Sequence, residues 1–210
     1  MTQALHVFHT DLSPRSRVYL QLGSVFAFPG EPFFQQLANG DWYVRLEKAF
    51  REIGFRDNLH GYNNIPDQEA FESDYIGLFE VGMGGAPCPL HSGHYARDRM
   101  KVMEEVLRFY RYFGYSWDAS RYRFPDHLSV ELEFMAYLSG EQAQSKLNAN
   151  SCLLAQRDFC LRQLVSWVAD FYERIIQNSR HEFFTETGLM LRDFIDFDYQ
   201  YLESSVQAAE

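Results

Sequence analysis

Two adjacent ionisable residues, Asp126 and His127, are the sharpest candidates for chemistry in this sequence. A carboxylate beside an imidazole can transfer protons in acid–base catalysis. The pair also follows Pro125, where the chain enters a run with helical apolar spacing, and aspartate is a favoured N-cap residue. From spacing alone the cap is the more frequent role. We therefore expect Asp126 to cap a helix that carries Leu128 and Leu132.

The same helix places three side chains on one face. His127, Glu131 and Phe134 stand at positions i, i+4 and i+7, which align along a helix. Polar groups on a mostly apolar face either pair with each other or await a partner. This face is therefore a candidate binding site.

A second group with chemical potential is the run from Cys88 to His94, which also contains His91. Cysteine and histidine at short spacing can bind zinc, but a structural zinc site needs four ligands in two pairs. No second pair follows. We therefore expect no metal here, and imidazoles that are solvated in a flexible loop.

Other reactive arrangements are missing or incomplete. Cys152 and Cys160 are about 12 Å apart along a helix, too far for a shared metal or a disulfide, so we expect both in the core. The glycines at 82, 84 and 85 lack the preceding strand and the lysine of a phosphate-binding loop. No serine or cysteine occupies a nucleophile elbow.

Composition narrows the classes of partner. The 210 residues are 46% apolar and 17% aromatic, which suits one folded domain, and 19 basic against 29 acidic residues give a net charge of −10. No basic cluster is large enough for nucleic acid, and the acidic balance favours cationic partners. With no signal-peptide pattern in residues 1–12, no apolar run of membrane-spanning length and few cysteines, we expect a cytoplasmic protein without stable membrane insertion.

Apolar periodicity and capping residues predict an all-α fold, a single helical domain over residues 1–210 with loose termini at 1–12 and 204–210. We expect loops at 54–66, 81–93 and 115–124, and no strand or repeat. The expected helices are 15–28, capped by Ser13; one from Asp41 to Gly54; one from Asp67; one from about Tyr95 to Gly114; and two or three after Pro125, including one through 160–175 and a last one through 183–194.

The run from Tyr122 to Met135 contains Pro-Asp-His followed by Leu-x-x-Glu-Leu-Glu-Phe-Met. It closely resembles the signature of the TorD/DmsD/NarJ family of redox-enzyme maturation chaperones. Other segments resemble the family in order: 17–20 with 26–29, Tyr75-Ile-Gly-Leu-Phe79, and 156–159 with Trp167. The resemblance thus spans about residues 15 to 195. One departure is Gln163-Leu164, where the family often has His-Leu.

The glycine and proline loop that ends in Pro87-Cys-Pro-Leu-His91 is most similar to the subgroup that serves type II dimethyl sulfoxide (DMSO) reductase-family enzymes. The resemblance implies a chaperone without catalytic activity or a cofactor of its own. Its partner would be the catalytic subunit of a molybdopterin oxidoreductase. The chaperone would hold that subunit's twin-arginine signal peptide or N-terminus until the molybdopterin cofactor is inserted, before export.

A signal peptide offers arginines and an apolar stretch, so its complement is an acidic groove lined by aromatic side chains. Under this reading Asp126 faces a guanidinium, and His127 and Tyr75 add hydrogen bonds. The residues that we expect at the partner-peptide site are Tyr75, Leu78, Phe79, Tyr95, Phe124, Pro125, Asp126, His127 and Glu131.

Three alternatives remain open at this point. The chain could be a small helical hydrolase that uses Asp126 and His127, a nucleotide-binding regulator, or a helical interaction protein with an unrelated partner. The residues do not identify the client enzyme, and they leave open whether the protein is a monomer or a homodimer.

Overall fold

The computed structural model describes residues 12–56, 67–82, 84–144 and 148–209. Within these ranges the regular structure is helical, and strand pairing is limited to an isolated antiparallel bridge between His91 and His127. The all-α prediction is confirmed. The helices are α1 (Pro14–Val25), α2 (Glu31–Ala38), α3 (Asp41–Ile53), α4 (Gln68–Phe79), α5 (Arg99–Phe113), α6 (Leu128–Gln144), α7 (Ala149–Phe159), α8 (Val168–Asn178) and α9 (Glu182–Gln207), with a 3-10 turn at Ser92–His94 and a π-helix at Cys160–Val165.

Local signals explain where several helices begin and end. The Ser13 hydroxyl accepts a hydrogen bond from Ser16 N, with proline at the first helical position, and Asp67 caps α4 in the same way through Ala70 N. Gly54 and Gly114 end α3 and α5 in the left-handed conformation, at φ 74° and 66°, which glycine adopts without strain. These boundaries agree with the prediction.

Other boundaries were predicted wrongly. Helix α1 ends at Val25 rather than 28, and α2 was missed, because Pro29-Gly30 was interpreted only as a stop, although proline is also favoured in a first helical turn. Asp41 is the first residue of α3 and Gly40 its N-cap. Helix α5 begins at Arg99 after an Asp98 cap, and the apolar residue Met100 in its first turn is 62% exposed.

The expected continuous helix through 160–175 is interrupted. The chain forms the π-helix, turns at Trp167 and resumes as α8, and the Trp167 indole N–H donates to the carbonyl of Gln163. A π segment keeps nearly helical apolar spacing, so periodicity does not reveal it. The expected loose tail is also wrong in part, since α9 continues to Gln207 and buries Val206. The segment 57–66 and residues 1–11 lie outside the described residues.

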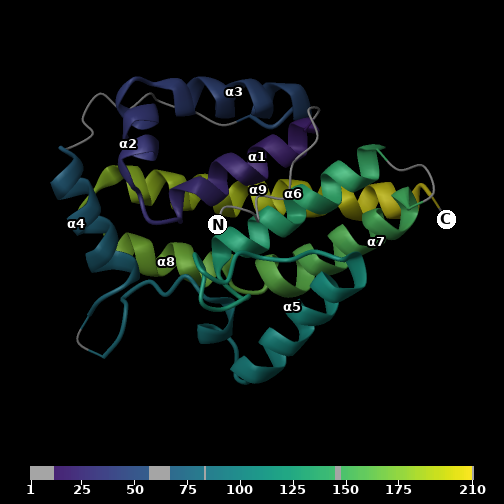
Figure 1. Ribbon diagram of the computed structural model, residues 1–210. Coiled ribbons are helices and arrows are strands. Elements are labelled where there is room, and N and C mark those ends of the chain that lie inside the picture. The colour runs from purple at the N-terminus through teal and green to yellow at the C-terminus, as the bar shows by residue number, and fades with distance from the viewer. Residues whose placement is uncertain (1–11, 57–66, 83, 145–147, 210) are drawn as a thin grey trace.

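Helix α1 lies at the centre of the packing. It contacts α6, α3 and α9, while α7 packs on α6 and α9, and α8 packs on α9 (Figure 1). Helices α1 and α6 lie close together at Gly23, where a Cβ would be in ordinary van der Waals contact with Leu132 Cβ, at 3.6 Å. Both Cys152 and Cys160 are buried thiols, as expected. Among the described helices none is long and apolar enough to cross a bilayer.

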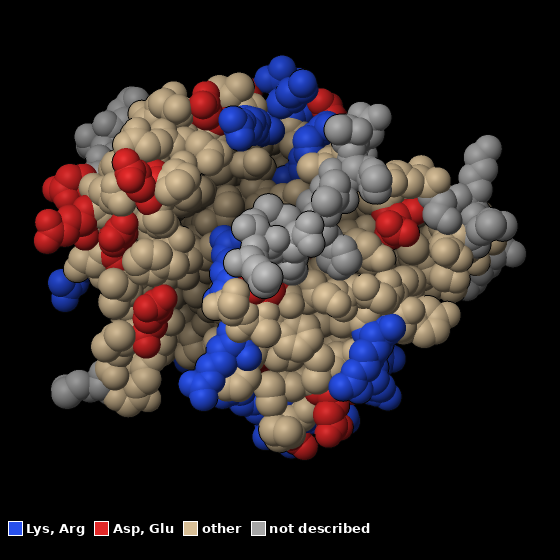
Figure 2. Space-filling view, viewed as in Figure 1, with Lys and Arg blue, Asp and Glu red and all other residues tan. Residues whose placement is uncertain are grey.

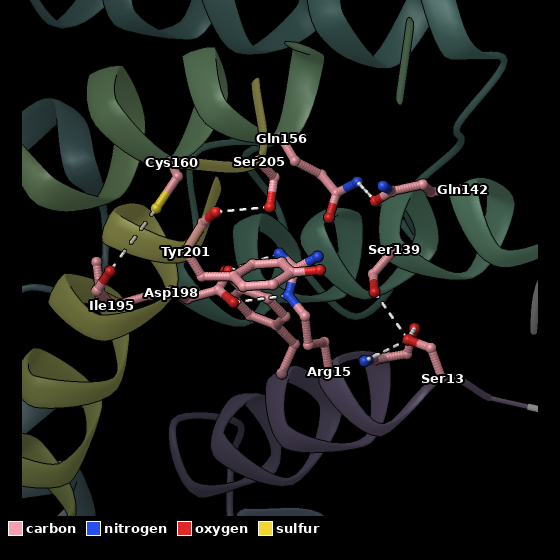
Figure 3. A network of polar contacts seen from close by, with 12 residues as sticks. Ser13, Arg15, Ser139, Gln142, Gln156, Cys160, Ile195, Asp198, Tyr201 and Ser205 are labelled. Carbon is pink, nitrogen blue, oxygen red and sulfur yellow. Dashed lines mark hydrogen bonds and ion pairs between the residues drawn. The ribbon is translucent and has the colours of Figure 1, made fainter. Parts of the chain in front are cut away.

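A buried ion pair ties α1 to α9 inside this core. Arg15 donates from Nε and Nη2 to the two carboxylate oxygens of Asp198, at 2.6 and 2.7 Å, and Tyr19 Oη donates to the same carboxylate at 2.6 Å. Figure 3 shows Arg15 reaching from α1 to Asp198 beneath the ring of Tyr201. Bidentate arginine–carboxylate pairs fix geometry as well as charge. This pair therefore sets the position of α9 on α1.

Replacing Asp198 with Ala should destabilise the protein by about 3 to 5 kcal/mol, because Arg15 and Tyr19 would keep buried polar groups without their acceptor. Glu52→Ala is the matched control. It removes the exposed partner of Arg17 and should cost less than about 1 kcal/mol. Urea denaturation of both variants measures the free energy of unfolding. Equal losses of stability would show that the buried ion pair contributes no more than the exposed one.

Candidate functional site

A cavity of about 810 Å³ opens between α4, α8 and two long loops. The first loop joins α4 to α5, and the second joins α5 to α6. Five separate parts of the chain meet at this cavity. The lining residues are Phe28, Tyr75, Phe79, Glu80, Gly84, Gly85, Ala86, Pro89, Leu90, His91, His94, Arg121, Tyr122, Arg123, His127 and Arg174.

The two loops are joined by backbone hydrogen bonds at the bridge between His91 and His127. Leu128 N donates to Leu90 O at 2.7 Å, and Ser92 N donates to Asp126 O at 3.0 Å. This pairing gives one wall of the cavity a regular geometry although both segments lie outside the helices.

The side chain of Asp126 completes the joint. It is fully buried, and its carboxylate lies 3.2 Å from His91 Nδ1 and accepts from Gly93 N at 3.3 Å. Burial opposes ionisation, but the hydrogen bond and charge of His91, the charge of Arg99 and the Gly93 N–H together hold the pKa of Asp126 below its ordinary value. We call these contacts of His91, Gly93 and Asp126 the loop clamp.

The prediction that Asp126 caps α6 is wrong. His127 takes that role, because its Nδ1 accepts a hydrogen bond from Ser129 N at 3.2 Å and its carbonyl accepts from Val130 N and Glu131 N. The sequence favoured aspartate because Asp126 immediately precedes the helix, but its side chain turns toward the other loop. The prediction of a solvated loop also fails for His91, which pairs with Asp126; His94 is exposed.

His127 is electrically neutral in the folded protein. Burial, followed by the charge of His91, lowers its pKa to about 3. Since Nδ1 accepts from Ser129 N, the proton resides on Nε2, which makes His127 a hydrogen-bond donor at the cavity wall.

Glu131 lies inside the protein and supports the first loop. The Ser92 hydroxyl donates to its Oε1 at 2.6 Å. Burial raises the pKa of Glu131 well above its ordinary value, which favours the neutral carboxylic acid. It is fully buried and so cannot meet a partner from solvent, contrary to its place in the expected peptide site.

The cavity brings together some of the expected site residues. Tyr75, Phe79 and His127 line it, but the Tyr75 hydroxyl already donates to Phe26 O at 2.9 Å and is not available for a partner. Pro125 and Asp126 are buried behind the wall, and the Asp126 carboxylate, which we expected to face a partner guanidinium, is paired with His91.

Leu78, Tyr95 and Phe124 lie outside the lining of this cavity. Leu78 faces a separate depression with Ser73 and Pro87. The Tyr95 ring stacks near Trp167 at 4.8 Å, and Phe124 lies 5.8 Å from the ring of His91. The last two residues support the wall from outside, which differs from the direct contact that we expected.

Sequence reasoning missed most of the charged lining. Glu80, Arg121, Arg123 and Arg174 all face the cavity and are exposed, as is Phe28, whose side chain is 51% exposed. The alternation Arg121-Tyr122-Arg123 beside the Pro-Asp-His motif is a signal that could have indicated a basic wall. Arg174 has no such signal, because α8 brings it from a distant part of the chain.

The chemistry of this lining is that of binding. It contains no serine, threonine, cysteine or lysine that could act as a nucleophile. Asp126 orients His91 and makes no hydrogen bond to His127, so the acid–base pair of the alternative hydrolase hypothesis is not assembled. The part of the chain that the structure describes holds no group of three metal-binding side chains, and Cys88 is buried; the absence of zinc remains a prediction for elemental analysis.

The state of Glu131 gives a pH-dependence prediction. Its pKa is raised on folding, so its stabilising effect is complete below the unfolded pKa of about 4.3 and is lost as pH rises toward the folded pKa. Glu131→Gln keeps the oxygen that accepts from Ser92 and cannot ionise. The free energy of unfolding of the variant should therefore gain on wild type as pH rises above 4.5, by up to about 1.4 kcal/mol per pH unit.

Urea denaturation between pH 4 and 8 measures this difference. Glu47→Gln, at an exposed position on α3, is the control and should show no such divergence. A constant difference between Glu131→Gln and wild type across the range would mean that Glu131 is ionised in the folded protein.

Comparison with known proteins identifies the family of the chain. A family profile described as nitrate reductase delta subunit matches residues 45–173. The chain is 31% identical over 162 residues to the chlorate reductase assembly chaperone of Ideonella dechloratans, covering 75% of this chain and 74% of the relative. It is 34% identical to the selenate reductase assembly chaperone of Thauera selenatis, with the same coverage.

A third relative is the perchlorate reductase assembly chaperone of Dechloromonas aromatica, 32% identical over 87% of both chains. The crystal structure of a redox enzyme maturation protein from Archaeoglobus fulgidus superposes with a TM-score of 0.52 and 19% identity, covering 93% of this chain and 99% of the other, which supports the fold. The chain therefore belongs to the TorD/DmsD/NarJ family of redox-enzyme maturation chaperones, which its Pro-Asp-His signature resembles.

Proposed function

We propose that this chain is the assembly chaperone of one molybdopterin oxidoreductase of the type II DMSO reductase group, and that it binds the catalytic subunit. The support lies in the relatives, whose names assign them to chlorate, selenate, perchlorate reductases and dimethyl sulfide dehydrogenase. The client in a relative's name does not identify the client of this chain. The glycine and proline loop that ends at His91 also resembles that of this subgroup.

The main support for a binding site is the cavity between the two clamped loops. Its volume is in the range of about 300 to 1,000 Å³ typical of ligand pockets. Phe28, Phe79 and Leu90 supply apolar surface, and charged side chains surround them. An extended or helical segment of a partner could place a few side chains here, as in other grooves that capture peptides.

The arginine acceptor of this site has to differ from the one that the sequence suggested. Asp126 is buried and paired, whereas Glu80 is exposed and lines the cavity. No ion-pair partner for Glu80 occurs within the described residues. We propose that Glu80 accepts an arginine of the client's twin-arginine signal peptide, while Phe28 and Phe79 take up its apolar stretch.

The place of action follows from this role. A chaperone that holds a signal peptide before export acts in the cytoplasm, and this is our proposal for the protein. It would release the catalytic subunit after the molybdopterin cofactor is inserted. Light scattering with and without the client distinguishes a monomer from a homodimer.

The test is affinity purification of the tagged chain from its own host, followed by mass spectrometry. We expect the catalytic subunit of a molybdopterin oxidoreductase at a stoichiometric ratio, with its N-terminal segment still attached. Calorimetric titration of that segment as a peptide should then show binding. Purification with an unrelated partner, or turnover of ester substrates by the chain alone, would contradict the proposal.

Phe28→Ser should weaken binding of the client peptide about tenfold, because exposed aromatic anchors at a pocket contribute strongly to affinity. Val44→Ser is the control, since Val44 is 66% exposed on α3 and does not line the cavity. Its affinity should equal that of wild type. Equal affinity of wild type, Phe28→Ser and Val44→Ser would show that the client peptide does not bind in the cavity.

A further inference from the structure

We propose that three arginines of this cavity, Arg121, Arg123 and Arg174, bind a carboxylate of the client, so that the segment seated there carries an aspartate or glutamate beside an apolar side chain. This inference rests on the proposed function and deepens it. We call these residues the arginine wall.

The charge of the arginine wall is opposite in sign to the net charge of the protein. The chain carries a net charge of −10, yet Glu80 is the acidic residue among the sixteen that line the cavity. Figure 2 shows a hollow on this face with Lys and Arg side chains at its edge, while Asp and Glu side chains gather farther out on the left. A client carboxylate would therefore meet a positive local potential on an otherwise acidic surface.

The three arginines have no carboxylate partner of their own. All are exposed, and none takes part in an ion pair among the described residues. Most other guanidiniums near a carboxylate in this protein pair with it, as Arg15, Arg17 and Arg192 do. The charges of the wall are thus available to an incoming group.

Aromatic rings hold the guanidiniums in place. Arg121 lies over Tyr122 at 5.0 Å, Arg123 over Phe124 at 5.3 Å and Arg174 over Tyr95 at 4.8 Å. Stacking uses the face of the guanidinium and leaves the N–H groups at its edge free. That edge matches the two oxygens of a carboxylate. Arginines ordered in this way lose less conformational entropy on binding.

The ring beneath Arg174 is itself anchored. The Tyr95 hydroxyl donates to Pro89 O at 3.0 Å, and its ring packs on Trp167. This gives Tyr95 a role that differs from the apolar contact expected from the sequence. It positions an arginine of the wall.

The two histidines at the loop pairing also favour an acceptor. His127 is neutral with its proton on Nε2, and the Nδ1 of His91 is already occupied by Asp126. A group with acceptors alone, such as a carboxylate or phosphate, matches this lining. The exposed Phe28, with Phe79 and Leu90, favours a carboxylate carried by a peptide, because a phosphate alone would leave this apolar surface uncovered.

The probe for the test is the client segment that hydrogen exchange finds protected in the purified complex. It is synthesised as the native peptide and as a twin in which every Asp and Glu is an amide. Fluorescence anisotropy of both peptides is measured with wild type and with Arg121→Gln/Arg123→Gln. Arg45→Gln/Arg111→Gln is the matched control, since it removes the same charge at exposed positions outside the cavity.

We expect wild type and the control to bind the native peptide about tenfold more tightly than its twin, and the cavity variant to lose that preference. Far-ultraviolet circular dichroism and thermal melts should show that all variants are folded, because the substituted side chains are exposed.

Equal binding of the two peptides by wild type, or a protected segment without Asp or Glu, would overturn the arginine wall and leave the proposed function standing. Failure of any molybdoenzyme subunit to bind would overturn both. Inorganic pyrophosphate is the last arm. If it binds to wild type more tightly than the native peptide and loses binding in the cavity variant alone, the wall is a phosphate site and the carboxylate proposal is wrong.

Discussion

The buried carboxylate of Asp126 is the contact on which the site depends. It joins the loop after α4 to the loop before α6, through His91 Nδ1 and Gly93 N, at the point where the two backbones pair. The fit is close, because a Cβ at position 93 would lie 2.9 Å from Asp126 Oδ2. The loop clamp and the backbone pairing together hold this wall of the cavity. The Pro-Asp-His run therefore has a structural role. Pro125 O accepts a hydrogen bond from the Tyr110 hydroxyl, Asp126 forms the loop clamp, and His127 caps α6.

Two buried carboxyl groups behind this wall are held in opposite states. His91, Arg99 and a backbone N–H hold the pKa of Asp126 below its ordinary value, whereas burial raises the pKa of Glu131, which accepts from the Ser92 hydroxyl. Both fasten the same loop, since Gly93 and Ser92 are adjacent. Asp126 and Glu131 are thus buried, and the surface of the cavity presents arginines, Glu80 and the neutral imidazole of His127. This arrangement separates the residues that build the site from those that can touch a client.

Much of the fold could be predicted from the sequence, because local signals set it. Ser13, Asp67, Gly54 and Gly114 act at the helix ends within a few residues of themselves. The π turn before Trp167 has no such local signal. The motif located the site correctly, but it could not show that Asp126 faces inward. The inward direction of the Asp126 side chain depends on Gly93, which lies 33 residues away and is brought close by the pairing of the loops. The arginine wall depends likewise on α8, which carries Arg174 to the cavity.

The central claim is that the client occupies the cavity between the clamped loops. Site-specific photo-crosslinking tests it most directly, with p-benzoylphenylalanine placed at position 28, at position 44 or at position 112 of the tagged chain. Position 28 lines the cavity, position 44 lies on α3, and position 112 lies on α5 beside a different groove. We expect a crosslink to the catalytic subunit from position 28 and none from positions 44 and 112. A crosslink from position 112 or 44, with none from position 28, would place the client elsewhere on the protein and contradict the account.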